Sequence, residues 1–471
     1  MPEKRSDTIF LRRAYAVTVV LLFLYFQFWQ VNFYLAQSIK DGVYLFVPPV
    51  LIAGVLYFRR LRDGIEVKLV AAYLIWVVIT RVLNGDRVLE RQYVFLLDLA
   101  LALPFLSLGL VLDDAGRRRV LNWLSAILGL CFSVLGLIGV YSYVTGRDLV
   151  NPITGGMLTS AFPLPGRGQL AFLDTNPNIV AFWYMIALTL MLWCAASDKR
   201  LWLRVLAALA ALLDIAVISL TQCRGVFLSV AVGLGLLAAL LLRRRCERQK
   251  AALTAALAIL VFLAAAAASY TAMDRLGALI WHEPTPVAAE ESAAMQAHLT
   301  PRAEPQMLRA VSDQREAEPV QLNSVFEKLD GISTGRLKIW KAAFQALREN
   351  PRILLFGQDG ASVIDETNRF LVQMQHYAES HFHNYLLHTL MLTGLPGLLL
   401  VLLFSVLLAL CCLRMLLTPA AALPDQILCI SALGAMLYGQ LEAGFFTFTD
   451  SRTLFFYLLA GFCLSAAAAK A

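Results

Sequence analysis

The sequence predicts an all-α protein that crosses a membrane with about twelve helices and carries a large, partly helical loop outside it. The chain of 471 residues is 59% hydrophobic and 15% charged, with a mean hydropathy of +0.67. Soluble proteins are roughly 45–50% apolar and about 25% charged, so a soluble enzyme is excluded. The apolar residues form runs about 20 residues long, which is the length a helix needs to cross a bilayer. The strands of a membrane β-barrel would instead alternate apolar and polar residues over about 10 positions.

Twelve apolar runs mark the expected spans. The first follows a basic N-terminus and exceeds the apolar core of a signal peptide, so we interpret it as a retained span. Basic residues gather in alternate loops, most densely at 243–250, and the positive-inside rule therefore predicts that both termini are cytoplasmic. The runs cover approximately residues 14–36, 43–58, 65–80, 93–112, 120–143, 179–195, 201–221, 226–242, 251–272, 384–413, 425–443 and 453–467.

Two outer segments, at about 145–178 and 273–382, are too long to be simple connections. We therefore divide the chain into nine spans in 1–272, a periplasmic loop domain at 273–382, and three spans in 383–471. The stretch around 283–320 is acidic and rich in alanine, which is typical of loosely structured chain.

The second half of the large loop predicts an amphipathic helix. Residues 336–350 place four large apolar side chains on one helical face, and Pro351 follows where a helix commonly ends. The four side chains are Leu337, Trp340, Phe344 and Leu347.

All six histidines fall between residues 282 and 388, in this loop and at the start of the next span. An exposed loop can simply tolerate histidine, but His383 directly precedes a long apolar run. Residues 385–413 would make a helix of roughly 43 Å, longer than the hydrocarbon core of about 30 Å, so its start is expected above the membrane. A helix N-terminus disfavours imidazolium, and a neutral ring can accept a proton. Gly394 and Gly397 would allow close helix packing below this histidine.

Two outer arginines suggest anion binding. Arg224 stands at the outer end of a span, against the positive-inside trend, and the adjacent Gly225 would let a phosphate approach the backbone. Arg336 lies in the first turn of the predicted loop helix, where positive charge opposes the helix dipole. The plainer alternatives are a snorkelling side chain for Arg224 and a solvated helix face for Arg336.

A metal site is not expected. Among His376, Glu379, His381 and His383, the two histidines at 381 and 383 could converge on one ion only from a strand or loop. The eight cysteines show no CxxC spacing, and we interpret them as small apolar fillers.

Three motifs, in order along the chain, resemble the superfamily of O-antigen ligases and O-antigen polymerases. Residues 224–228, Arg-Gly-Val-Phe-Leu, resemble its Arg-x3-Leu element at an outer helix end. Residues 336–340, followed by NPRILLFGQDG, resemble its loop helix and the turn after it. His383-Asn384, nine residues, and then Gly394-Leu-Pro-Gly397 resemble the histidine motif of the ligases.

The resemblance implies an inverting, metal-independent glycosyltransferase of the C type in a bacterial inner membrane, with a periplasmic active site and no cofactor. The donor would be a glycan on undecaprenyl pyrophosphate, and the acceptor would be lipid A–core, as in lipopolysaccharide biosynthesis. His383 would be the general base, while Arg224 and Arg336 would bind the pyrophosphate and stabilise the leaving group. Asn384, Gly394 and Gly397 would support the histidine.

Several alternatives stay open from the sequence. A polymerase of O-antigen or capsular repeat units and a protein O-oligosaccharyltransferase share this superfamily. A transporter is the alternative from a different class, and it would need ionisable groups along a path through the membrane. The candidates at mid-span are sparse, namely Asp98, Asp214 and Glu442.

Overall fold

The computed structural model describes residues 3–29, 54, 61, 63–84, 93–145, 149–150, 157–164, 167–172, 176–245, 260, 335–358, 360–374, 381–442 and 451–468. Apart from Gly54 and Leu260, the spans expected at 43–58 and 251–272 lie outside these residues, as does the acidic stretch at 283–320.

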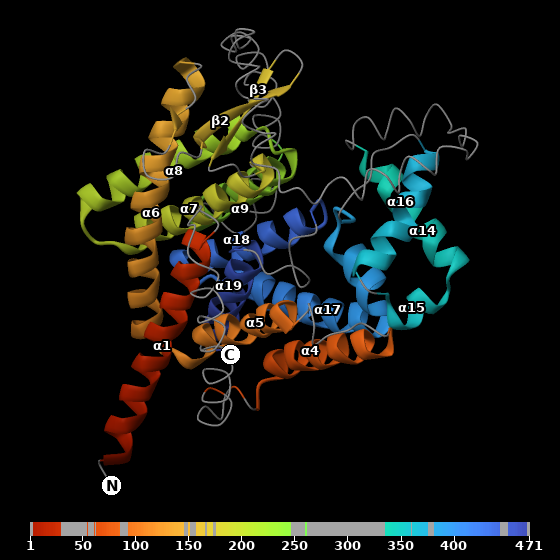
Figure 1. The fold of residues 1–471 in the computed structure, drawn as a ribbon. Coiled ribbons are helices and arrows are strands. Elements are labelled where there is room, and N and C mark those ends of the chain that lie inside the picture. Colours follow the sequence, from red (N-terminus) through yellow and green to blue (C-terminus); the bar gives the residue numbers. More distant parts are fainter. Residues whose placement is uncertain are drawn as a thin grey trace.

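Every other expected span is helical, so the prediction of an all-α, multi-pass membrane protein is confirmed (Figure 1). By length and hydropathy, α6 to α9 and α17 are each sufficient to cross a membrane, whereas the count of twelve spans stays a prediction. The helices are α1 (Glu3–Trp29), α4 (Ile65–Leu83), α5 (Tyr93–Val111), α6 (Asp114–Thr145), α7 (Pro177–Ser197), α8 (Leu201–Thr221), α9 (Arg224–Arg245), α17 (Tyr385–Leu417), α18 (Leu423–Gly439) and α19 (Ser451–Ala468).

Two helices organise the bundle. α7 is buried on nearly all sides from Val180 to Leu190 and packs against α6, α8 and α18. Its uniformly apolar sequence is the pattern expected of a helix surrounded by other helices. α17 packs against α4, α18 and α19, so the residues at its first turn are held close to the last turn of α18.

The outer segment at 145–178 contains a small antiparallel sheet that the sequence analysis did not predict. Its strands are β1 (Leu149–Val150), β2 (Met157–Leu164) and β3 (Arg167–Phe172), in the order β1-β2-β3. Leu164 pairs with Arg167, so only Pro165 and Gly166 connect β2 to β3. A Pro-Gly pair is typical of a tight turn, so the hairpin of β2 and β3 could have been predicted from these two residues.

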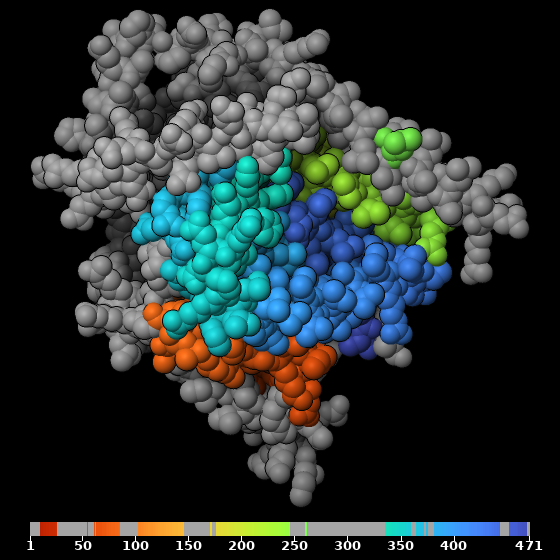
Figure 2. Space-filling model, turned by 90° about the vertical axis from the view of Figure 1, so that its right-hand side faces the viewer, coloured from red at the N-terminus to blue at the C-terminus, as the bar shows by residue number. Residues whose placement is uncertain are grey.

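The second half of the large loop forms α14 (Arg336–Glu349), α15 (Arg352–Phe356) and α16 (Gly360–Gln373). Figure 2 shows this group, in cyan, lying against α17 in blue and α4 in orange. The loop helix at 336–350 is therefore confirmed, and it begins after Gly335, whose φ of 86° suits glycine.

The predicted apolar face of α14 is wrong in part. Phe344 is 59% exposed, and Leu337, Trp340 and Leu347 are only half-buried. The buried stripe is formed by Ile339, Ala342, Ala343 and Ala346, which pack near Phe370 and Leu371 of α16. The small alanine side chains let α14 and α16 approach each other closely. The stability gained from this close packing outweighs the larger apolar area that the aromatic residues of α14 would bury.

Candidate functional site

The proposed base His383 lies in a turn that is fixed at the start of α17. Its φ of 48° is left-handed, which is uncommon for a residue with a side chain. The next residue, Asn384, caps the helix, because its Oδ1 accepts a hydrogen bond from the Leu387 amide at 2.9 Å. Its Nδ2 donates to the Gln440 carbonyl at 3.0 Å. One asparagine therefore holds the start of α17 against the end of α18.

Glu442 faces this turn from just beyond α18. Its Oε1 lies 3.2 Å from Nδ1 of His383 and 3.6 Å from Nε2 of His381. The two imidazole rings are 4.0 Å apart between centroids and meet edge to face. Three ionisable side chains thus lie close together, and only the two histidines are close in sequence.

The interpretation of Glu442 as a mid-span residue is wrong. α18 ends at Gly439, three positions earlier, so the carboxylate lies past the end of the helix. Burial raises the pKa of Glu442, but the hydrogen bond and charge of His383, together with Arg452 and His381, outweigh burial and lower it to about 2. Glu442 is therefore ionised at neutral pH.

The helix-dipole argument for a neutral His383 is incomplete, because it did not include the carboxylate of Glu442. A carboxylate at 3.2 Å attracts positive charge to the ring more directly than a helix terminus repels it. Glu442 Oε1 lies beside Nδ1, and the neutral tautomer that carries its proton on Nδ1 has its lone pair on Nε2.

The loop helix α14 holds the histidine turn from the other side. The indole Nε1 of Trp340 donates to the Phe382 carbonyl at 2.9 Å. Phe382 itself is 2% exposed and belongs to the small core formed by α14, α15 and α16 with α17. The backbone between the two histidines is thereby anchored to the loop helices.

Arg224 begins α9, as predicted, and its side chain is exposed. The turn before it reverses the chain through Gln222, which has a left-handed φ of 54°. The prediction that Gly225 opens the backbone to a phosphate is not supported, because its α-carbon faces Leu441 and Tyr438. A methyl group there would lie 3.4 Å from the Leu441 Cβ. The start of α9 is therefore packed beside the segment that carries Glu442.

Arg336 approaches the same place from the first turn of α14. Burial, with a smaller contribution from the negative charge of Glu442, raises the pKa of Cys223 to about 11, and the positive charge of Arg336 opposes this rise. Cys223, which precedes Arg224, is therefore within electrostatic reach of both groups. The fold thus brings the arginine of the loop helix, the start of α9 and the His383 turn to one region of the molecule.

Gly394 and Gly397 permit close helix packing on α17, as expected. Gly394 kinks α17 with a φ of 68°, and a side chain there would collide with the carbonyl of Leu355 in α15. Gly357, with a φ of 65°, faces the Leu392 backbone in the same way, and the Gln358 amide donates to the Met391 carbonyl at 3.0 Å. The first glycine therefore docks the loop helix α15, not another span, onto α17.

Gly397 lies one turn further on. A side chain there would meet Thr393 of its own helix and then Trp76 of α4. The indole Nε1 of Trp76 donates to the Thr393 carbonyl at 2.7 Å, which is freed by the kink before Pro396. The second glycine thus allows α4 to approach the kinked part of α17.

Two groups of side chains could supply ligands to a metal ion within the described residues. Each of His381, His383 and Glu442 offers one ligand atom, and these atoms lie within 4.8 Å of one another. Three protein ligands is the number found in catalytic zinc sites, so the prediction of no metal needs a direct test. The second group lies inside the bundle, between α17, α18 and α19, and consists of Cys412, Cys429 and Cys463. His376 and Glu379 lie outside the described residues.

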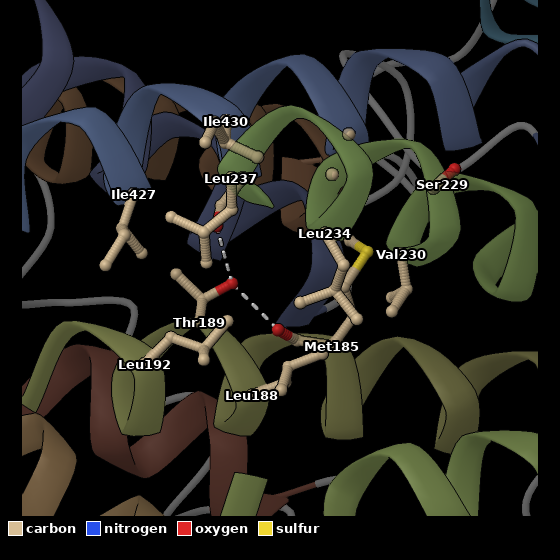
Figure 3. Close-up of a pocket in the computed structure, with 13 residues that line it drawn as sticks. Met185, Leu188, Thr189, Leu192, Ser229, Val230, Leu234, Leu237, Ile427 and Ile430 are labelled. Carbon is tan, nitrogen blue, oxygen red and sulfur yellow. Dashed lines mark hydrogen bonds between the residues drawn. The ribbon is translucent and has the colours of Figure 1, made fainter. Parts of the chain in front are cut away.

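An apolar groove runs between α7, α9 and α18 (Figure 3). Its few hydroxyl groups are already hydrogen-bonded. Thr189 donates to the Met185 carbonyl at 2.8 Å, and Ser229 donates to the Gly225 carbonyl at 2.9 Å. The groove therefore suits an apolar chain and offers little to a polar solute.

Residues 207–402 match the family model described as O-antigen ligase. The matched segment contains Arg224, Arg336, His383 and both motif glycines, whereas Glu442 lies beyond its end. No curated protein matches the chain. The match confirms the resemblance carried by the three motifs and supports a membrane glycosyltransferase of the ligase and polymerase type that uses a lipid-linked glycan. Residues 207–402 of this multi-pass membrane protein are therefore similar to the O-antigen ligase family.

Proposed function

We propose that this protein transfers a glycan from undecaprenyl pyrophosphate to an acceptor hydroxyl at the periplasmic face of the bacterial inner membrane. The observation that carries the proposal is the pair formed by His383 and the ionised Glu442, beside the ends of α9 and α14 that bear Arg224 and Arg336. Both termini are cytoplasmic in this proposal, as the basic loops predict.

His383 acts as the general base. Glu442 accepts a hydrogen bond from Nδ1–H, so Nε2 is the nitrogen that accepts the proton of the acceptor hydroxyl. The acceptor oxygen attacks the anomeric carbon as its proton passes to Nε2. The bond from that carbon to the phosphate oxygen breaks on the opposite face, the configuration inverts, and undecaprenyl pyrophosphate leaves. Glu442 stabilises the imidazolium that forms.

Arg224 and Arg336 stabilise the leaving pyrophosphate. Negative charge grows on the bridging oxygen as the glycosidic phosphate bond breaks, and guanidinium groups match phosphate geometry with paired donors. A pyrophosphate held by two arginines is already a good leaving group, so the reaction needs no metal. Arg224 is exposed and is therefore accessible to a ligand.

The apolar groove between α7, α9 and α18 holds part of the polyprenyl chain of the donor. α9 connects the two sites, because Arg224 begins this helix and Val230, Leu234 and Leu237 line the groove further along it. The headgroup would lie at the membrane surface while the chain enters the bilayer.

Ligation to lipid A–core is the reaction we favour, because the histidine motif is the most specific of the three. A repeat-unit polymerase and a protein O-oligosaccharyltransferase would use the same base and arginines with a different acceptor. The transporter alternative lacks support. Glu442 lies at the outer end of α18 and not at mid-span. Of the other two mid-span candidates, Asp98 and Asp214, the structure describes the side chain of Asp214 only.

The test is glycan transfer by the purified full-length protein in nanodiscs, with an undecaprenyl-pyrophosphate-linked donor. Parallel reactions offer lipid A–core, a second lipid-linked repeat unit, or a serine-containing peptide as acceptor. We expect transfer to lipid A–core and a loss of about 10²–10⁴-fold in kcat for His383→Ala. Arg336→Ala should also abolish most activity, whereas Arg348→Ala on the exposed end of the same helix should not.

Three results would contradict the proposal. Full activity of His383→Ala would show that His383 is not the general base. Exclusive use of another acceptor would show that the protein is a polymerase or a protein O-oligosaccharyltransferase and not a ligase. Loss of transfer after chelation, with recovery on adding zinc, would replace the base with a metal ion held by His381, His383 and Glu442.

A further inference from the structure

A second hollow lies at the opposite end of the bundle from the proposed active site. It is found where α6 begins, α7 ends and α18 begins. Arg117 and Arg118 of α6, Trp193 and Ser197 of α7, and Asp425 of α18 are among its lining residues. The length of α18 alone separates it from Glu442 by roughly 25 Å, at about 1.5 Å per residue.

Arg117 is only partly satisfied in this hollow. Its side chain is 5% exposed, and Nη2 donates to Asp114 at 3.0 Å and to Asp425 at 3.3 Å. Its Nη1 is buried with no hydrogen-bond partner in the part of the chain that the structure describes. A buried donor on a charged group is costly when unpaired, so this nitrogen indicates a ligand that supplies an oxygen atom.

The charge of the lining favours an anion. The lining holds two arginines and one aspartate, and Arg117 is already paired with both Asp425 and Asp114, so among the described residues the unpaired positive charge of the lining is that of Arg118. Arg118 is exposed at the edge of the hollow and adds a second set of donors. Arg244 of α9 lies close by, where its Nη2 donates to the Ala421 carbonyl at 2.7 Å beside α18. The positive charge at this end is therefore only partly neutralised by protein groups.

The position of the hollow indicates a lipid. α6 and α7 are both long and apolar enough to cross a membrane, so the hollow lies at a membrane surface. Its lining passes from charged residues to Leu121 and Trp193, as would suit a headgroup above acyl chains. Basic pockets between membrane helices on the cytoplasmic side are a recurrent way of binding anionic headgroups.

We propose that this hollow binds the phosphate of an anionic phospholipid, such as phosphatidylglycerol, in the cytoplasmic leaflet. Arg117 Nη1 and Arg118 donate to the phosphate oxygens, and the acyl chains lie along Leu121. Ser197 Oγ, whose proton is donated to the Cys194 carbonyl at 3.4 Å, accepts a hydrogen bond from a hydroxyl of the headgroup. The leaflet follows from the proposed orientation, but the site itself is independent of glycan transfer.

The test measures lipid binding to the full-length protein by native mass spectrometry, with phosphatidylglycerol and zwitterionic phosphatidylcholine titrated separately. Arg118→Gln removes one donor group without disturbing the Arg117–Asp425 pair. Ala196→Phe fills the hollow without changing its charge. Arg119→Gln is the matched control, because Arg119 is the next residue, is equally exposed, and does not line the hollow.

We expect Arg118→Gln and Ala196→Phe each to weaken phosphatidylglycerol binding at least fivefold, with Arg119→Gln and phosphatidylcholine binding unchanged. The proposal is overturned if both variants bind like the wild type, or if Arg119→Gln weakens binding as much as Arg118→Gln, since surface charge alone would then explain it. Titration with inorganic phosphate separates the two sources of this chemistry. Displacement of the lipid by inorganic phosphate at equal concentration would show a free-phosphate site instead of a lipid site.

Discussion

The carboxylate oxygen Oε1 of Glu442 lies 3.2 Å from Nδ1 of His383. In the sequence, the two residues are separated by both α17 and α18. This contact joins the histidine motif to a residue that no motif contains. It gives the proposed base a permanent negative partner, and that partner makes the role of His383 testable without altering the histidine itself.

Glu442→Gln should lower kcat about 10²-fold while leaving the donor KM nearly unchanged. Glutamine keeps the size of the side chain but cannot offset positive charge on the ring as the acceptor loses its proton. Steady-state transfer kinetics provide the measurement, with Glu366→Gln on α16 as a control carboxylate. An unchanged kcat would show that Glu442 is structural only.

The same carboxylate should make stability depend on pH in acid. Its folded-state pKa of about 2 lies below the usual 4.5, so its contribution is fully present above about pH 4.5 and is lost as the pH falls toward 2. At neutral pH this corresponds to up to about 3 kcal/mol. Thermal unfolding in detergent should therefore show Glu442→Gln less stable than wild type at pH 7, with the gap narrowing below about pH 4.5 and closing near pH 2. A gap that keeps its full size at pH 2 would argue against this linkage.

Trp340→Phe should reduce kcat without unfolding the loop helices. The change removes the hydrogen bond to the Phe382 carbonyl but keeps an aromatic ring in the cluster, so the His383 turn loses an anchor worth about 1 kcal/mol. We expect a fall in kcat of about tenfold and an unchanged melting temperature within a few degrees. Trp202→Phe, at a site 61% exposed, serves as the control. Equal kcat values for both variants would refute the anchoring role.

Gly394→Ala should destabilise the docking of α15 on α17. A methyl group there would collide with the Leu355 backbone, and the left-handed φ costs a further 1–2 kcal/mol or so for a residue with a β-carbon. Gly434→Ala is the matched control, since its added carbon would lie at an ordinary 3.5 Å from the Ser229 carbonyl. Limited proteolysis between α14 and α17 should be accelerated only in the first variant. Equal protection of the two variants would contradict the docking.

Leu237→Trp should impair use of a long-chain donor. The larger side chain would enter the apolar groove, so the KM for an undecaprenyl donor should rise several-fold while that for a two-isoprene analogue stays constant. Leu241→Trp, at a position 43% exposed on the same helix, controls for a bulky residue facing outward. A parallel rise in both KM values would place the polyprenyl chain elsewhere.

Local patterns predicted most of the helices and the motif positions. Hydropathy located α6 to α9, α17 and α19 to within a few residues, because an apolar run of that length has no other stable form in a bilayer. The end of α18 was placed too far along the chain, since apolar residues continue beyond Gly439. Because of that small error, Glu442 was interpreted as a mid-span residue. The buried face of α14 was also misassigned, because the choice between Phe344 and Ala343 depends on the shape of α16.

By itself, the sequence determined that this is a helical membrane protein and which histidine and arginines carry the motifs. Both follow from properties of neighbouring residues, namely hydropathy, charge and spacing. Tertiary structure alone decided that Glu442 meets His383, that Trp340 holds the turn between the histidines, and that Gly394 receives a loop helix. These contacts join residues far apart in the chain, and their energies depend on packing geometry that no local pattern records.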